Sequence, residues 1–186
     1  MTILVFDDNA THRNAAKAQL KGHDLTVVGT YDEAQKALSA ECDYEKATLA
    51  TNALFPNFDP HKSTDGEKKK AYWAAKEEQR KLATTFPDFD VVLTDLLVPA
   101  SSQAQGSDSY SLVGKEMPVG IFIGLLAAVR TKAKFVAVFT DSDHHSHPAS
   151  ACMDPFNAGE CNPTPFLVKD CRVLLSNTRN WVDHFD

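Results

Sequence analysis

The fold expected for this chain is decided by the stretch Phe89-Asp90-Val91-Val92-Leu93-Thr94-Asp95-Leu96-Leu97-Val98-Pro99. Residues 91–93 form a short apolar run, which predicts a strand buried on both faces. Asp95 closes this strand, and Pro99 prevents its continuation. A carboxylate at the carboxyl end of a buried parallel strand stands where open α/β sheets bind their ligands. A single aspartate there is more often a helix cap, so its meaning depends on the ends of the other strands.

Apolar runs elsewhere predict four more strands, at residues 3–6, 25–28, 134–139 and 165–168. Asn9 or Thr11 is placed to cap a helix after the first strand, and Thr30 and Glu33 form a capping box that begins a second helix. This alternation of strands and helices predicts a parallel sheet with right-handed crossovers. We therefore expect an α/β three-layer sandwich with a doubly wound, mainly parallel, five-stranded sheet.

A long apolar helix is expected over residues 112–130, where Gly120 and Gly124 would allow close packing against the sheet. The tail after Lys169 has two interpretations. It is either a last helix, or a strand over 172–175 that pairs in a hairpin around Lys169 and Asp170, followed by a short helix.

Residues 43–87 interrupt the alternation of strands and helices. This span contains a proline-broken loop and one expected helix, over residues 67–84, but no strand signal. From Asp59 to Lys81 seven Lys or Arg face five Asp or Glu, which favours a solvated helix face over a nucleic-acid-binding arm. We expect a single domain over residues 1–186 with a helical insertion at 43–87, after the second helix.

Composition narrows the function classes. A net charge of −6 argues against a nucleic-acid-binding surface, which needs a basic excess. No apolar run is long enough to span a bilayer, and the first residues lack the features of a signal peptide. The four cysteines form no CxxC pair, so reduced thiols in the cytoplasm are the default expectation.

Polar side chains follow several of the expected strands: Asp7 and Asp8, Asp95, Thr140 and Lys169. In a parallel sheet they would gather along one edge. Three carboxylates in one crevice repel each other unless a cation is present, and oxygen-only ligands suit Mg²⁺ better than zinc. A carboxylate can attack phosphorus, while a hydroxyl and a lysine hold phosphoryl oxygens. The pattern predicts phosphoryl transfer.

At these positions the chain resembles the receiver domain of two-component response regulators, a CheY-like, flavodoxin-like α/β family. The resemblance rests on the motifs Phe6-Asp7-Asp8-Asn9, Leu93-Thr94-Asp95-Leu96-Leu97-Val98-Pro99, Val138-Phe139-Thr140 and Phe166-Leu167-Val168-Lys169. It implies that Asp7 and Asp8 bind Mg²⁺ together with Asp95, and that Asp95 is the phosphoacceptor. It also implies Thr140 as the switch hydroxyl, Phe166 as the switch aromatic and Lys169 as the lysine of the site.

The function implied by this resemblance is a response-regulator receiver rather than an enzyme. Asp95 would accept phosphate from a histidine kinase or phosphotransfer protein, with self-catalysed dephosphorylation at most. Output would pass through a downstream protein partner, without nucleic acid or membrane.

Three alternatives remain open at this stage. Asp7-Asp8-Asn9-Ala10-Thr11 loosely matches the nucleophile motif of haloacid dehalogenase-like phosphatases, in which Asp7 would be the nucleophile. The cluster His144-His145-Ser146-His147, with Cys152 or Cys161, has the residue types of a zinc site but no common ligand spacing. A degenerate receiver that is never phosphorylated would act as an interaction module.

Overall fold

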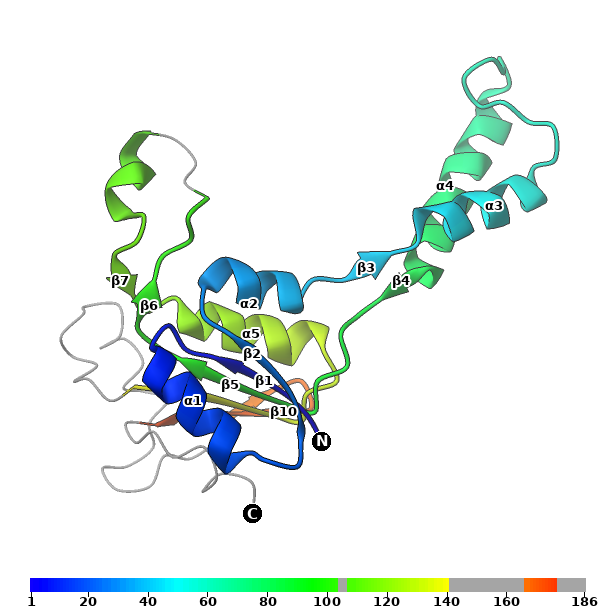
Figure 1. Ribbon diagram of the computed structural model, residues 1–186. Helices are drawn as coiled ribbons and strands as arrows, with labels where there is room; N and C mark the ends of the chain where they lie inside the picture. The colour runs from blue at the N-terminus through cyan, green and yellow to red at the C-terminus, as the bar shows by residue number, and fades with distance from the viewer. Residues whose placement is uncertain (104–106, 141–165, 177–186) are drawn as a thin grey trace. The chain divides into compact units, whose positions relative to one another are not determined.

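The computed structural model describes residues 1–103, 107–140 and 166–176 (Figure 1). The chain divides into two compact units. One consists of Met1–Ser39 and Pro87–Asp186 and is called the body. The other, Ala40–Phe86, is called the arm.

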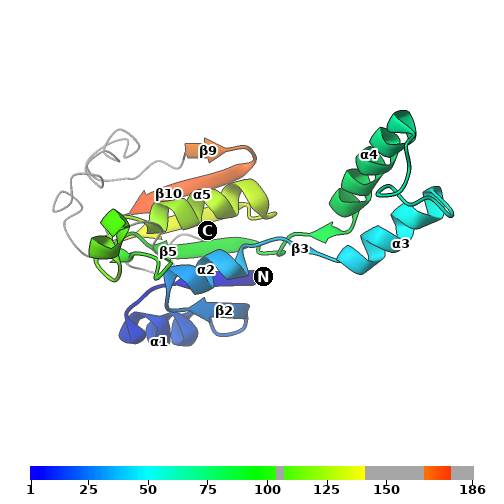
Figure 2. The same ribbon diagram turned by 90° about the horizontal axis from the view of Figure 1, so that it is seen from above.

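A six-stranded sheet forms the centre of the body (Figures 1 and 2). Its strands, in spatial order, are β2 (Asp24–Val28), β1 (Thr2–Phe6), β5 (Val91–Asp95), β8 (Phe135–Phe139), β10 (Cys171–Ser176) and β9 (Phe166–Val168). The first five are parallel to their neighbours, and β9 pairs antiparallel with β10. The predicted α/β fold with a five-stranded, mainly parallel sheet is confirmed. The strand expected at 165–168 is the antiparallel edge strand β9, and the fifth parallel strand is β10.

Alternating side chains of each central strand enter two separate cores. Leu4 and Phe6 of β1 pack in the cluster that includes α2 (Tyr31–Ala37) and α5 (Gly120–Arg130). Ile3 and Val5 pack in the cluster that includes α1 (Ala10–Gln19). Successive residues of a strand point to opposite faces, so a strand apolar at every position must be covered on both sides. The sheet is therefore the middle layer of a sandwich.

The first two helices begin where the sequence predicts. The Asn9 side chain accepts a hydrogen bond from the Thr11 amide at 2.9 Å and caps α1. Thr30 and Glu33 form the expected capping box at the start of α2. Both caps satisfy amides that have no partner within the helix.

The helix α5 is shorter than the 112–130 expected. It begins at Gly120, after the 3-10 helix η1 (Ser107–Leu112) and the antiparallel pair β6 (Val98–Pro99) and β7 (Glu116–Met117). Gly114 has a φ of 74°, a left-handed conformation that interrupts a helix. The predicted close packing of the two glycines is confirmed. A Cβ at Gly120 would lie 1.7 Å from the Asp95 carbonyl oxygen, and one at Gly124 would lie 3.1 Å from Val136 and Val138 side chains.

Two helices and a short ribbon make up the arm. The strands β3 (Glu41–Cys42) and β4 (Thr84–Thr85) pair antiparallel, and α3 (Tyr44–Leu54) and α4 (Gly66–Leu82) lie between them in sequence. The expectation of one helix and no strand over 43–87 is wrong. Strands of two residues leave no periodicity to detect, whereas the aspartate caps of α3 and α4, Asp43 and Asp65, are recognisable start signals.

Within the residues that the structure describes, no helix has both the length and the apolar character needed to cross a membrane.

Candidate functional site

Acidic and hydroxyl side chains meet at the edge of the sheet where the parallel strands end. Asp7 and Asp8 follow β1, Asp95 is the last residue of β5, and Thr140 follows β8. The register pairs Asp95 with Phe139, which places Thr140 one residue beyond Asp95 on the neighbouring strand. Asp7 is fully buried, and Asp95 and Thr140 are 5% and 3% exposed. These four residues lie together at the edge that the sequence predicts.

The three carboxylates form a group with the geometry of a metal site. One carboxylate oxygen from each of Asp7, Asp8 and Asp95 lies within 4.8 Å of the others. Asp8 is half-buried, whereas Asp7 and Asp95 are buried. Carboxylate oxygens are the ligands that Mg²⁺ and Ca²⁺ prefer, and their combined negative charge favours a divalent ion. The donor set therefore fits the Mg²⁺ site expected from the sequence.

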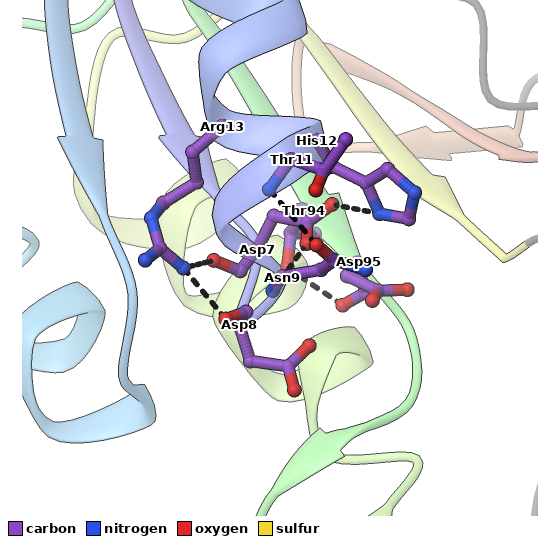
Figure 3. A network of polar contacts seen from close by, with 8 residues as sticks. All are labelled: Asp7, Asp8, Asn9, Thr11, His12, Arg13, Thr94 and Asp95. Carbon is purple, nitrogen blue, oxygen red and sulfur yellow. Dashed lines mark hydrogen bonds and ion pairs between the residues drawn. The ribbon is translucent and has the colours of Figure 1, made fainter.

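The Asp7 side chain is oriented by the start of α1 (Figure 3). Its Oδ1 accepts a hydrogen bond from the Asn9 amide at 2.8 Å, and its Oδ2 lies 3.5 Å from Nδ1 of His12. Thus Asn9 both caps α1 through its side chain and holds the buried carboxylate through its backbone. Sequence analysis did not identify His12, because a lone histidine on a helix carries no spacing signal.

Around Asp95 the backbone is fixed by a hydrogen bond within β5 and by two neighbouring segments, β8 and α5. The Thr94 hydroxyl donates to the Asp95 carbonyl at 3.0 Å, and the Leu96 amide donates to the Phe139 carbonyl at 2.6 Å. The Gly120 amide donates to the Leu96 carbonyl at 3.1 Å, so the start of α5 lies directly against the end of β5. This packing leaves no space for a side chain at residue 120.

The structure does not place Lys169 at this edge, which corrects the expected position. Lys169 lies in the turn between β9 and β10, at the start of a strand that runs parallel to β8. Its Nζ donates to the carbonyl of Val129, near the end of α5. The hairpin around Lys169 and Asp170, the second interpretation of the tail, is the one observed. A tight turn reverses the chain, so the two strands cannot both end at one edge.

Phe166 does not lie on the fifth parallel strand, where it was expected. Phe166 begins the antiparallel edge strand β9 and pairs with Val173, so β10 separates it from β8. The parallel strand beside β8 is β10, which ends at Ser176, opposite Phe139. Phe166 is therefore not on the strand next to Thr140, where a switch aromatic was expected. The backbone of Ser176 reaches the carboxyl edge instead.

The zinc alternative rests on residues that lie outside the described part of the chain: His144, His145, His147, Cys152 and Cys161.

The loop that follows β6 is tethered to α2. Asp32 accepts hydrogen bonds from the Ser101 hydroxyl at 2.5 Å, the Ser102 hydroxyl at 2.6 Å and the Ser102 amide at 3.0 Å. The hydroxyl donors, first that of Ser101 and then that of Ser102, lower the pKa of Asp32 below its usual range. Sequence analysis missed this contact because it joins residues about 70 positions apart.

Arg13 is a further residue of the site that sequence analysis missed. It projects from α1, and its Nη1 donates to the backbone carbonyls of Asp7 and Asp8, each at 2.7 Å (Figure 3). An arginine five residues after an acidic pair is one signal that could have drawn attention to it.

Comparison of the chain with models of protein families, with curated proteins and with solved structures finds no match.

Proposed function

We propose that this chain is a receiver-like phosphoacceptor domain, in which Asp95 is phosphorylated in a Mg²⁺-dependent reaction. The observation that carries the proposal is the convergence of three carboxylates from the ends of two neighbouring parallel strands, with oxygens within 4.8 Å of one another. Thr140 directly follows β8, the next strand, and so lies one residue beyond the position opposite Asp95. This arrangement reproduces, at the same edge, four of the residues that the receiver resemblance implies.

The reaction requires one nucleophilic oxygen and neutralisation of negative charge. An oxygen of the Asp95 carboxylate would form a bond to phosphorus while the bond from phosphorus to the donor breaks, and the electron pair of that bond leaves with the donor. Asp7, Asp8 and Asp95 would hold Mg²⁺, which supplies charge neutralisation for the phosphoryl oxygens. The Thr140 hydroxyl would donate a hydrogen bond to one of them.

The position of Asp95 supports its role as the acceptor rather than Asp7. Asp95 is the last residue of β5, which is paired on both sides, so its carboxylate belongs to the carboxyl edge of the sheet, and the residue is 5% exposed. Asp7 is fully buried and tied to the Asn9 amide and His12, which leaves it less accessible. By the resemblance, the donor would be a histidine kinase or phosphotransfer protein and the output a protein partner.

The test is labelling with acetyl phosphate in the presence of Mg²⁺. The protein should gain one phosphoryl group, measured by intact mass, and the group should be labile to base as acyl phosphates are. Asp95→Asn should gain none, whereas the exposed control Asp170→Asn should label like the wild type. Labelling of Asp95→Asn, or stable label on serine or threonine, would contradict the assignment of Asp95.

A second candidate function, a degenerate receiver that acts only as an interaction module, is favoured by the position of Lys169. A lysine that neutralises a phosphoryl oxygen was expected at the site, and Lys169 lies at the opposite end of β10. Binding of Mg²⁺ without any labelling of Asp95 would support this candidate over the phosphoacceptor.

The haloacid dehalogenase-like alternative has less support than either receiver function. It would also use Lys169 at the site, and it makes the fully buried Asp7 the nucleophile. Sustained hydrolysis of a small phosphate ester, lost in Asp7→Asn, would support it.

A further inference from the structure

Arg13 binds the backbone of the acidic pair rather than its carboxylates. The two 2.7 Å hydrogen bonds from Nη1 end on the carbonyl oxygens of Asp7 and Asp8. Arg13 therefore does not occupy the carboxylates through these two bonds, while its guanidinium contributes a positive charge near the three negative ones (Figure 3). An arginine paired directly with a carboxylate would instead compete with the metal.

The guanidinium is seated against a residue that has no side chain. A Cβ at Gly29, just after β2, would lie 3.0 Å from Cζ and from Nη1 of Arg13. That spacing is tighter than ordinary van der Waals contact, so the absence of a side chain at residue 29 makes room for Arg13. Gly29 does not have a positive φ, so its backbone conformation does not require glycine. The structural reason for a glycine at this position is the space that Arg13 occupies.

The turn that contains Gly29 is itself held in place by the start of α2. Glu33 Oε2 accepts hydrogen bonds from the amides of Gly29 at 2.9 Å and Thr30 at 3.2 Å. The Gly29 amide is the largest cause of the lowered pKa of Glu33, and the positive charge of Arg13 also contributes. Arg13 thus lies between two fixed segments, the β2–α2 turn and the end of β1.

The last ladder residue of β1 is Phe6, so Asp7 and Asp8 extend beyond the paired part of the strand. The amide of Asp7 still donates to the Val28 carbonyl at 3.3 Å, which is longer than the 2.7 Å bonds from Arg13. The bonds from Arg13 hold the carbonyls at this point, where the ladder has ended. A metal site needs its ligands held by a supporting layer of contacts, and loss of such contacts typically costs 10- to 100-fold in affinity.

We propose that Arg13 is a positioning residue, which fixes the backbone of Asp7 and Asp8 through their carbonyls and thereby presents their carboxylates toward Asp95. The effect of Arg13 on metal binding rests on the proposed function. The clamp, meaning the two hydrogen bonds from Arg13 to the carbonyls of Asp7 and Asp8, is independent of that function and can be measured in the metal-free protein.

The first experiment measures amide hydrogen exchange by NMR without metal. In Arg13→Ala the Asn9 amide, which donates to Asp7, should exchange faster than in the wild type by roughly tenfold, while Leu93 in the middle of β5 is unchanged. Gly29→Ala should shift Asn9 in the same direction by less, because the new Cβ displaces the guanidinium without removing it. Arg13→Lys should restore part of the protection, since an ammonium can still donate to a carbonyl.

Matched controls lie in the arm. Arg80→Ala removes an arginine that forms an exposed ion pair with Glu77, and Gly66→Ala adds a Cβ where no atom lies within 4 Å. Neither should change exchange at Asn9. Unchanged exchange at Asn9 in both Arg13→Ala and Gly29→Ala would overturn the proposal. Equal acceleration at Asn9 and Leu93 would also overturn it, because Arg13 would then support the whole fold rather than the acidic pair.

The second experiment measures Mg²⁺ affinity by titration. The dissociation constant should rise about tenfold in Arg13→Ala and less in Arg13→Lys. If the wild-type protein neither binds Mg²⁺ nor labels on Asp95, the proposed function fails, whereas the exchange data still decide the clamp. If the wild type binds Mg²⁺ and Arg13→Ala binds it equally well, the positioning role fails and the proposed function stands.

Discussion

The body buries whole strands, whereas the arm buries only a few side chains of its two helices. Every residue of β5 and of β8 is buried. In the arm the buried side chains of the two helices are Ala47, Thr51 and Tyr72. Six large apolar side chains of the arm are exposed: Tyr44, Leu49, Leu54, Trp73, Leu82 and Phe86.

Local contacts compensate for the small core of the arm. Phe55, Phe58 and Trp73 surround the Tyr72 ring at centroid distances of 5.4, 5.7 and 5.4 Å. Asp43 and Asp65 cap the two helices, and Lys68 and Lys76 lie over the rings of Phe58 and Trp73. Contacts of this kind contribute about 0.5–1.5 kcal/mol each, less than the burial of a large side chain in a sheet. The comparison teaches that the candidate functional site belongs to the body, the unit in which whole strands are buried.

The largest effect is expected from Gly120→Ala in the body. The new Cβ would meet the Asp95 carbonyl oxygen at 1.7 Å, and backbone must move to relieve this contact. We expect a loss of about 3 kcal/mol or more in the free energy of unfolding, measured by urea denaturation of the body signals. Gly66→Ala in the arm meets open space and should leave stability unchanged or slightly raised. Equal stability of the two variants would contradict the close packing of α5.

A smaller and more local effect is expected from Tyr72→Ala. Tyr72 is 6% exposed and contacts three aromatic rings, so its removal should destabilise the arm by about 3 kcal/mol. Amide exchange should accelerate throughout α3 and α4 while β5 remains protected. Tyr44→Ala, in the same arm but 65% exposed, should have little effect. Parallel loss of protection in β5 would show that the two units unfold together.

The smallest effect concerns two carboxyl groups with lowered pKa values. Asp32 in the body owes its shift mainly to Ser101 and Ser102 hydroxyls, whereas Asp59 in the arm owes its shift mainly to the nearby His61 amide. A lowered pKa in the folded state contributes stability that is present above the unfolded value of 3.8 and is lost as the pH falls through the folded pKa. The tether of the 101–102 loop should therefore weaken below pH 3.8.

NMR titration of the carboxyl carbons checks this difference. In the double variant Ser101→Ala and Ser102→Ala, the pKa of Asp32 should rise toward its usual value and that of Asp59 should not change. If the pKa of Asp32 stays where it is in the wild type, the serine hydroxyls do not hold the loop.

Local sequence patterns were sufficient for much of the body. The apolar runs around Leu4, Val92 and Val136 indicated strands buried on both faces, and parallel strands bring their carboxyl ends to one edge. For this reason Asp7, Asp8, Asp95 and Thr140 could be placed together before the structure was known. The caps of α1 and α2 were also predictable, since each joins residues within one helical turn.

Contacts that depend on the path of the chain were decided only by tertiary structure. Residues 166–168 and 171–176 are both apolar enough for strands, and composition does not determine which one pairs parallel with β8. The structure shows that β10 is the strand that pairs with β8. Lys169 adopts a φ of 55° in the turn that reverses the chain between β9 and β10. As a result, Lys169 precedes the fifth parallel strand instead of ending it.

The seat of Arg13 against Gly29 and the tether of Asp32 to Ser101 likewise join segments that are brought together by folding. Sequence alone determined the layers of the body and the acidic residues at its edge, because hydrophobic periodicity and capping act over a few residues. Tertiary structure decided which basic side chain lies at that edge, Arg13 and not Lys169. The reason is that strand direction and side-chain reach depend on the pairing of distant segments.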